Sequence, residues 1–131
     1  LDWCVVAGDE AALPAVARWL EQAEPGTTVF AFAEVADEAE RQEIQSAADV
    51  RLTWLYRNGA EPGTTTLLQD AVLGLEFPAG DGFVWVGGEA TTLKPIRRGL
   101  RERGLPRASI DVDGYWKRGV VAFDHHQQDD D

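Results

Sequence analysis

Two short segments of the sequence have the residue types of loops that could approach an anionic ligand. Gly8-Asp9-Glu10-Ala11 and Gly87-Gly88-Glu89 each follow an apolar run, and a proline comes a few residues after each of them. Glycine allows close approach of the backbone, and the unpaired N–H groups at a helix start favour anions. The acids oppose this, because Asp9, Glu10 and Glu89 could cap the same N–H groups and would repel a phosphate. Since no GxGxxG motif occurs, the spacing leaves nucleotide binding and helix capping as open alternatives.

Basic residues concentrate in one segment of an otherwise acidic chain. The net charge is −11, which argues against a nucleic acid partner because phosphate binding needs a basic surface. Eight of the 12 basic residues lie between Lys94 and Arg118 with only three acids, so that segment carries +5 and the rest of the chain −16. The basic segment could receive a small anion, or its arginines could form a solvated helix face.

The other features that could indicate a chemical function, which are the cysteine, the histidines and the apolar runs, predict little. Cys4 is the single cysteine and lies in an apolar run, which predicts a buried, inert thiol and a reducing, cytoplasmic compartment. His125 and His126 lie in a polar tail without further ligands, so no metal site is predicted. No apolar run approaches the roughly 18 residues that a membrane span requires.

These residues must be positioned by elements that alternate along the chain. Short apolar or alternating runs predict strands at 3–7, 28–35, 50–55, 83–86 and 109–113. Helical spacing of apolar residues predicts helices at 10–22, 66–75 and 91–103, and the polar segment 37–47 predicts a short, exposed helix. A chain of 131 residues has the size of one domain.

The strand patterns also predict the topology. Five strands with helices between them form a parallel sheet with right-handed crossovers. The first, second and fourth strands are uniformly apolar and belong in the centre, whereas the third and fifth alternate and belong at the edges. We therefore expect an α/β fold, a three-layer doubly wound sheet of order 3-2-1-4-5. Ligands of such sheets bind outside the carboxyl ends of the strands at the switch point, between the first and fourth strands.

Four segments placed around this switch point resemble the signature segments of siderophore-interacting proteins. They are AGDEAALPA, WLYRNG, VWVGGEATTLKPIRRGLRERG and DGYWKRG, and the resemblance covers nearly the whole chain from Trp3 to Gly119. That family consists of flavin-dependent ferric-chelate reductases related to the ferredoxin–NADP reductase superfamily. The resemblance implies that residues 1–119 are the C-terminal NAD(P)H-binding domain and that an N-terminal FAD-binding β-barrel is missing. Residues 120–131 are then expected to be a disordered tail. The start at Leu1 rather than Met agrees with a fragment.

The resemblance also assigns candidate cofactor contacts. Gly8-Asp9-Glu10-Ala11 would lie along a pyridine nucleotide near its pyrophosphate, and Gly87-Gly88-Glu89 near the place where the nicotinamide meets the flavin. Arg57 matches the position that holds the 2′-phosphate in NADP-using relatives, or it forms a surface salt bridge. Tyr56 stands where family members more often have histidine, and it could stack on the adenine or cap the sheet edge.

The segment that follows the last predicted strand completes the set. Tyr115 and Trp116 would approach the flavin and could cover it, or they simply pack against the sheet edge. Lys94, Arg97, Lys117 and Arg118 are candidate contacts for an anionic ferric siderophore, or they are solvated.

The function implied by the resemblance is hydride transfer from NADH or NADPH to an FAD held mainly by the missing barrel domain. Single electrons then reduce Fe(III) in a siderophore, and iron is released as Fe(II). No side chain is predicted to act as general acid, base or nucleophile, so the fragment alone is expected to be inactive. The alternatives are a stand-alone nucleotide-binding or protein-interaction module without catalysis, and a reductase for another acceptor.

Overall fold

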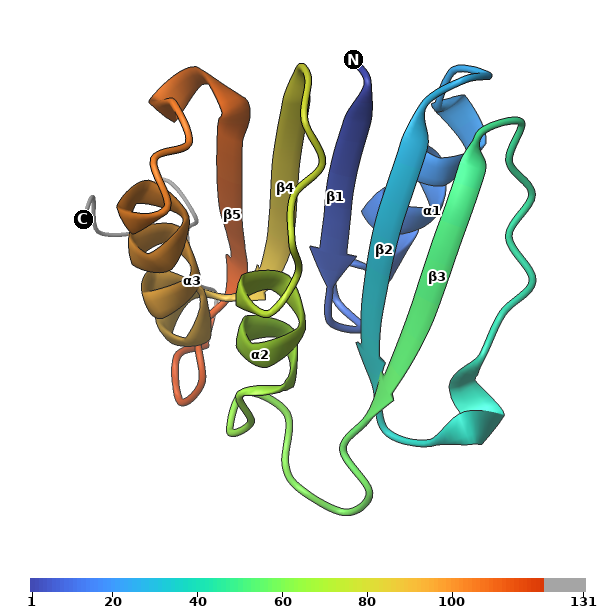
Figure 1. Ribbon diagram of the computed structural model, residues 1–131. Coiled ribbons are helices and arrows are strands. Elements are labelled where there is room, and N and C mark those ends of the chain that lie inside the picture. Colours follow the sequence, from blue (N-terminus) through green and yellow to red (C-terminus); the bar gives the residue numbers. More distant parts are fainter. Residues whose placement is uncertain (122–131) are drawn as a thin grey trace.

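A five-stranded parallel sheet runs through the computed structural model, which describes residues 1–121 (Figure 1). The strand order is β3-β2-β1-β4-β5, which confirms the predicted doubly wound topology. The strands are β1 (Trp3–Gly8), β2 (Thr28–Val35), β3 (Asp49–Tyr56), β4 (Gly82–Glu89) and β5 (Ile110–Trp116). Apart from Val120 and Val121, the predicted tail lies outside the described residues, and so do His125 and His126.

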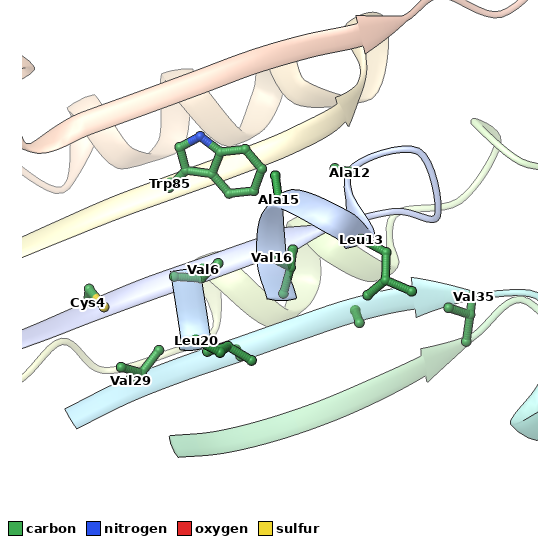
Figure 2. Close-up of a cluster of buried hydrophobic side chains, with 12 residues drawn as sticks. Cys4, Val6, Ala12, Leu13, Ala15, Val16, Leu20, Val29, Val35 and Trp85 are labelled. Atoms are coloured by element: carbon green, nitrogen blue, oxygen red, sulfur yellow. The ribbon is translucent and has the colours of Figure 1, made fainter. Parts of the chain in front are cut away.

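Helices cover both faces of the sheet and give the three predicted layers. Helix α1 (Leu13–Gln22) lies on one face, and α2 (Leu67–Leu73) and α3 (Ala90–Glu102) lie on the other (Figure 1). The sheet separates two apolar clusters, because side chains of a strand alternate between its faces. Figure 2 shows the cluster beneath α1, where Val16 and Leu20 of the helix meet Val6 of β1 and Val29 of β2. Cys4 is buried in this cluster, as predicted.

The central position of β1 brings the two glycine loops together. All six residues of β1 are buried, and the strand pairs with β2 on one side and β4 on the other. Gly8, the last residue of β1, is in register with Ala33 of β2 and Gly87 of β4. The ends of β1 and β4 therefore lie side by side at one edge of the sheet, as the switch-point prediction requires, and α3 begins directly after β4 at Ala90.

Several elements differ from the sequence prediction. Strand β4, predicted at 83–86, includes Gly87, Gly88 and Glu89, which were expected to follow it. The helix predicted at 37–47 is reduced to a single 3-10 turn, η1 (Glu38–Glu40), because the segment has no apolar stripe to bury against the sheet. The last strand is longer than predicted and includes Gly114, Tyr115 and Trp116, which were expected to follow it. Its pairing with β4 continues through Gly88 opposite Gly114, and a bulge then sets Glu89 opposite Trp116. A second 3-10 turn, η2 (Arg107–Ser109), precedes β5.

Candidate functional site

The turn after β1 is organised by the carboxylate of Asp9, which is 6% exposed. Its Oδ1 accepts hydrogen bonds from the backbone N–H groups of Ala11 (3.0 Å) and Ala12 (3.3 Å), just before α1 begins. Its Oδ2 accepts a hydrogen bond of 2.9 Å from the indole N–H of Trp116. Burial raises the pKa of the Asp9 carboxyl, and these hydrogen bonds partly offset that rise. The amides of Ala11 and Ala12, in the turn before α1, are thus already occupied.

Glu89 does the same at the end of β4. Its carboxylate accepts from the backbone N–H groups of Thr91 (3.0 Å) and Thr92 (2.9 Å), so it caps α3, and it also accepts from the N–H of Arg118 (3.2 Å). Gly88, which precedes it, has a φ of 154°, and a Cβ atom there would stand 2.8 Å from Asp9 Oδ2. The Asp9 carboxylate therefore lies against the bare backbone of Gly88, and the two loops are in contact.

Arg57 follows β3 and is buried in an ion-pair network, with 4% of its side chain exposed. Its two terminal nitrogens donate to the two carboxylate oxygens of Glu10 at 2.6 and 2.7 Å, and Glu34 Oε2 lies 3.6 Å away. Glu34 also accepts from the hydroxyl of Thr65 at 2.9 Å. The hydrogen bonding that Arg57 donates to Glu10 is the main cause that raises the pKa of Arg57, while burial is the main cause that raises the pKa of Glu34. The network ties the loops after β1 and β3 and the segment before α2 to the end of β2.

The aromatic candidates are separated by the structure. Trp116 lies against the loops at the strand ends, where its ring is close to the backbone of Gly63. Tyr115 instead makes an edge-on contact with Trp85, with ring centroids 6.3 Å apart, on the α1 side of the sheet. Tyr56 is half-buried against the same α1-side cluster. Tyr115 and Trp116 therefore pack in two different places, and the flavin contact expected for them stays a prediction.

The crevice between the two loops is filled by the protein's own side chains. The remaining cavity has a volume of about 10 Å³, room for about one water molecule at most. Three of its lining acids, Asp9, Glu34 and Glu89, are buried. The other lining residues are Gly63, Thr65, Leu68, Gln69, Thr92 and Ile96. Sequence reasoning missed Glu34 and Thr65, although an acid inside an apolar strand was a signal for the former.

The four basic candidates fall on two elements. Lys117 and Arg118 follow β5 at the same edge as the crevice, and the Arg118 guanidinium donates to Glu61 at 2.8 Å on the surface. Lys94 and Arg97 lie on α3, where Arg97 donates to the carbonyl of Val112 in β5 at 3.2 Å. Arg97 also lines a cavity of about 50 Å³ with two arginines that the sequence reasoning did not single out, Arg101 and Arg107.

The interior of this edge is closed to a pyridine nucleotide, whereas its rim carries an exposed carboxylate. The amides of Ala11 and Ala12 before α1 are occupied by Asp9, and those of Thr91 and Thr92 in α3 by Glu89, so these amides cannot hold a pyrophosphate while the bonds persist. At the corner beside β3, 38% of the Glu10 side chain is exposed, and its oxygens can accept from a ribose hydroxyl. The glycine positions Gly87 and Gly88 place no side chain between the two loops. A nucleotide on this edge would therefore be contacted from the rim, by acceptors such as the Glu10 carboxylate.

Residues 1–121 contain neither a cluster of metal ligands nor a membrane-spanning helix. No group of three or more His, Cys, Asp or Glu side chains there is arranged to hold a metal ion. None of the helices in this part of the chain is both long and apolar enough to cross a bilayer.

Comparison with known proteins adds a family to this geometry. A family model described as siderophore-interacting protein matches residues 1–119. A ferric vibriobactin reductase, ViuB of Vibrio cholerae, is 31% identical, with 97% of this chain and 47% of the relative covered. An uncharacterized protein of Mycobacterium tuberculosis is 33% identical over 90% of this chain and 45% of its own length. The chain spans about half the length of the curated relatives it matches.

Solved structures agree with the sequence comparisons. A siderophore utilization protein from T. fusca is 56% identical with a TM-score of 0.92, covering 95% of this chain and 48% of the other. The siderophore-interacting protein SipS from Aeromonas hydrophila shares the fold, with a TM-score of 0.79 at 24% identity, covering 92% and 48% of the two chains.

Proposed function

This chain belongs to the siderophore-interacting protein family, and we propose that it is the NAD(P)H-binding half of a flavin-dependent ferric-siderophore reductase. The observation that carries the proposal is the meeting of the β1 and β4 loops at the switch point, in a family whose relatives include a ferric vibriobactin reductase. In doubly wound sheets that edge is where dinucleotides bind. The chemistry that nucleotide and flavin supply when bound is hydride transfer, followed by one-electron reduction of Fe(III) in a cytoplasmic compartment.

The role of the chain's own residues is binding and orientation. Glu10 and Tyr56 are proposed to face the adenosine end, and the loops that contain Gly8 and Gly88 the middle and nicotinamide end. No residue of the site is arranged as a nucleophile with its base, because Asp9 and Glu89 are engaged with backbone amides. This assignment gives the protein the task of holding the cofactors while the cofactors perform the chemistry.

The rest of the reductase is proposed to lie in the half of the relatives' length that this chain does not span. Residues 1–119 are then one domain, and an FAD-binding barrel of the same full-length protein is its partner. Lys117 and Arg118 are proposed to meet the anionic ferric siderophore from the same edge, whereas Lys94 and Arg97 on α3 would contribute only if the siderophore also contacts that helix.

The proposal is tested by binding and by turnover. Isothermal titration of the chain with NADH, NADPH and ADP should give saturable binding of a pyridine nucleotide, and Gly88→Val should abolish it while Gly104→Val does not. An Fe(II)-chelator assay with NAD(P)H, FAD and a ferric siderophore should give no activity for the chain alone and activity for the full-length protein. Reduction by the chain alone would contradict the division of labour. Absence of any nucleotide binding would favour an interaction module.

A further inference from the structure

The corner of the sheet at the ends of β2 and β3 is strongly acidic. It holds the Glu10–Arg57–Glu34 network, and the chain segments on either side of it add further carboxylates. These are Asp37, Glu38 and Glu40 in and before η1, and Glu61 in the loop after β3. η1 is the short turquoise turn next to the arrowheads of β2 and β3 in Figure 1. Arg41 lies 3.7 Å from Glu38 and Arg118 lies 2.8 Å from Glu61, so two of these four charges are offset at the surface.

Arg57 does not offer its charge to a ligand in this arrangement. Both terminal nitrogens are bonded to Glu10, a second carboxylate lies 3.6 Å from one of them, and 4% of the side chain is exposed. Its Nε is buried without a hydrogen-bond partner among the described residues, so the side chain is held in place although not all of its donors are satisfied. A guanidinium with two carboxylates has a net charge of −1. A phosphate group arriving here would have to displace the bidentate partner of Arg57.

This corner is where doubly wound domains distinguish the two pyridine nucleotides. An acid near the end of the second strand accepts from the ribose 2′-hydroxyl of NAD, whereas a free arginine nearby accommodates the 2′-phosphate of NADP. Glu10 comes from the turn after β1 rather than from the end of β2, but its carboxylate reaches the same corner through Arg57 and 38% of its side chain is exposed. Arg57, which has the chemistry of the second kind of residue, is neutralised. A 2′-phosphate carries nearly two negative charges and would meet unfavourable potentials from several carboxylates.

We propose that this corner selects a nucleotide with a free ribose 2′-hydroxyl over one with a 2′-phosphate, and that Glu10 is the specificity-determining residue. The inference rests on the proposed function, because it assumes that a pyridine nucleotide lies along this edge. It reassigns Arg57 from a phosphate ligand to a positioning residue, which holds the Glu10 carboxylate in place for the ribose.

The test is a comparison of affinities on the intact chain by isothermal titration. NADH should bind about tenfold more tightly than NADPH, which corresponds to about 1.4 kcal/mol. ADP should likewise bind more tightly than adenosine 2′,5′-bisphosphate. Glu10→Gln keeps the shape of the side chain, removes its charge and partly frees Arg57, so the NADH to NADPH ratio should fall toward one. Glu21→Gln, which removes the same charge from the other end of α1, should leave the ratio unchanged.

Each outcome of the titrations bears either on the nucleotide selectivity alone or on the proposed function as well. Tighter or equal binding of NADPH by the wild-type chain overturns the inference while the proposed function stands. An unchanged ratio in Glu10→Gln also overturns it, because another feature then discriminates. If neither nucleotide binds, the proposed function fails and the inference fails with it. The wild-type comparison does not depend on any variant folding.

Discussion

The hydrogen bond between Trp116 and Asp9 joins residues 107 positions apart and is open to a quantitative test. Trp116→Phe removes the indole donor at 2.9 Å from a carboxylate that is 6% exposed. A hydrogen bond to a charged group contributes about 1.5–3 kcal/mol. Asp9 keeps its two backbone donors, so the loss should lie toward the lower end. We expect the free energy of unfolding to fall by about 2 kcal/mol, most of it from the hydrogen bond.

The measurement is urea denaturation at pH 7, followed by tyrosine and tryptophan fluorescence and by circular dichroism. Trp54→Phe is the matched control, because Trp54 is also half-buried and its indole N–H has no hydrogen bond within the described residues. That variant should cost under about 1 kcal/mol. In a double-mutant cycle, Asp9→Asn and Trp116→Phe should couple by about 1 kcal/mol or more. Equal losses in the two tryptophan variants, or a coupling energy near zero, would refute the idea that this bond holds the loops together.

Three further predictions follow from the same edge. Gly88→Ala should lower the free energy of unfolding by about 2 kcal/mol or more, because the new Cβ would stand 2.8 Å from Asp9. Gly104→Ala is the control, because Gly104 has a φ of 87° but open space around it, and it should lose less stability in the same denaturation assay. Arg57→Ala should lower the free energy of unfolding by about 3–5 kcal/mol by leaving buried Glu34 unpaired, whereas Arg51→Ala, whose pair with Asp49 is exposed, should lose under about 1 kcal/mol. The pKa of Glu34 is raised in the folded state, so just above the ordinary glutamate range the folded protein binds more protons than the unfolded chain. The contribution of Glu34 to the free energy of unfolding therefore falls as pH rises through the folded pKa. Glu34→Gln should flatten the measured pH dependence of stability there, and an unchanged slope would contradict the assignment.

The topology could be predicted from the sequence because it depends on local patterns. Whether a strand is uniformly apolar or alternating is set by its own residues, and this pattern placed β1 and β4 in the centre and β3 and β5 at the edges. The helix predicted at 37–47 was wrong beyond one turn, because local propensity alone does not decide whether a segment becomes a helix. Its residues favour helix locally, but without an apolar face they have nothing to pack against, and propensity alone did not produce more than one turn.

The site could be predicted only in part, because its contacts join distant segments. The sequence located Asp9, Arg57 and Trp116 and predicted that Asp9 and Glu89 could cap helices. The hydrogen bonds confirm this for Glu89, whereas Asp9 binds the amides of the turn before α1, whose N-cap residue is Ala12. Glu10, offered as a third possible cap, pairs with Arg57 instead, 47 positions away. No spacing rule specifies such a pair, since it depends on how the loops after β1 and β3 meet at the edge of the sheet.

The carboxylates of Asp9 and Glu89 also limit the ability of the glycine segments to bind an anion. An amide N–H that donates to Asp9 or Glu89 is not available to a phosphate. Both carboxylates are buried, so a phosphate that took over these amides would leave the displaced carboxylate as a desolvated negative charge. The loops therefore fix the relative positions of β1, β4 and Trp116 rather than cradle an anion. Any ligand on this edge must be held from the rim, where Glu10 and the residues after β5 are exposed. This is why we expect discrimination between nucleotides to reside at the corner beside β3 and not in the glycine turns.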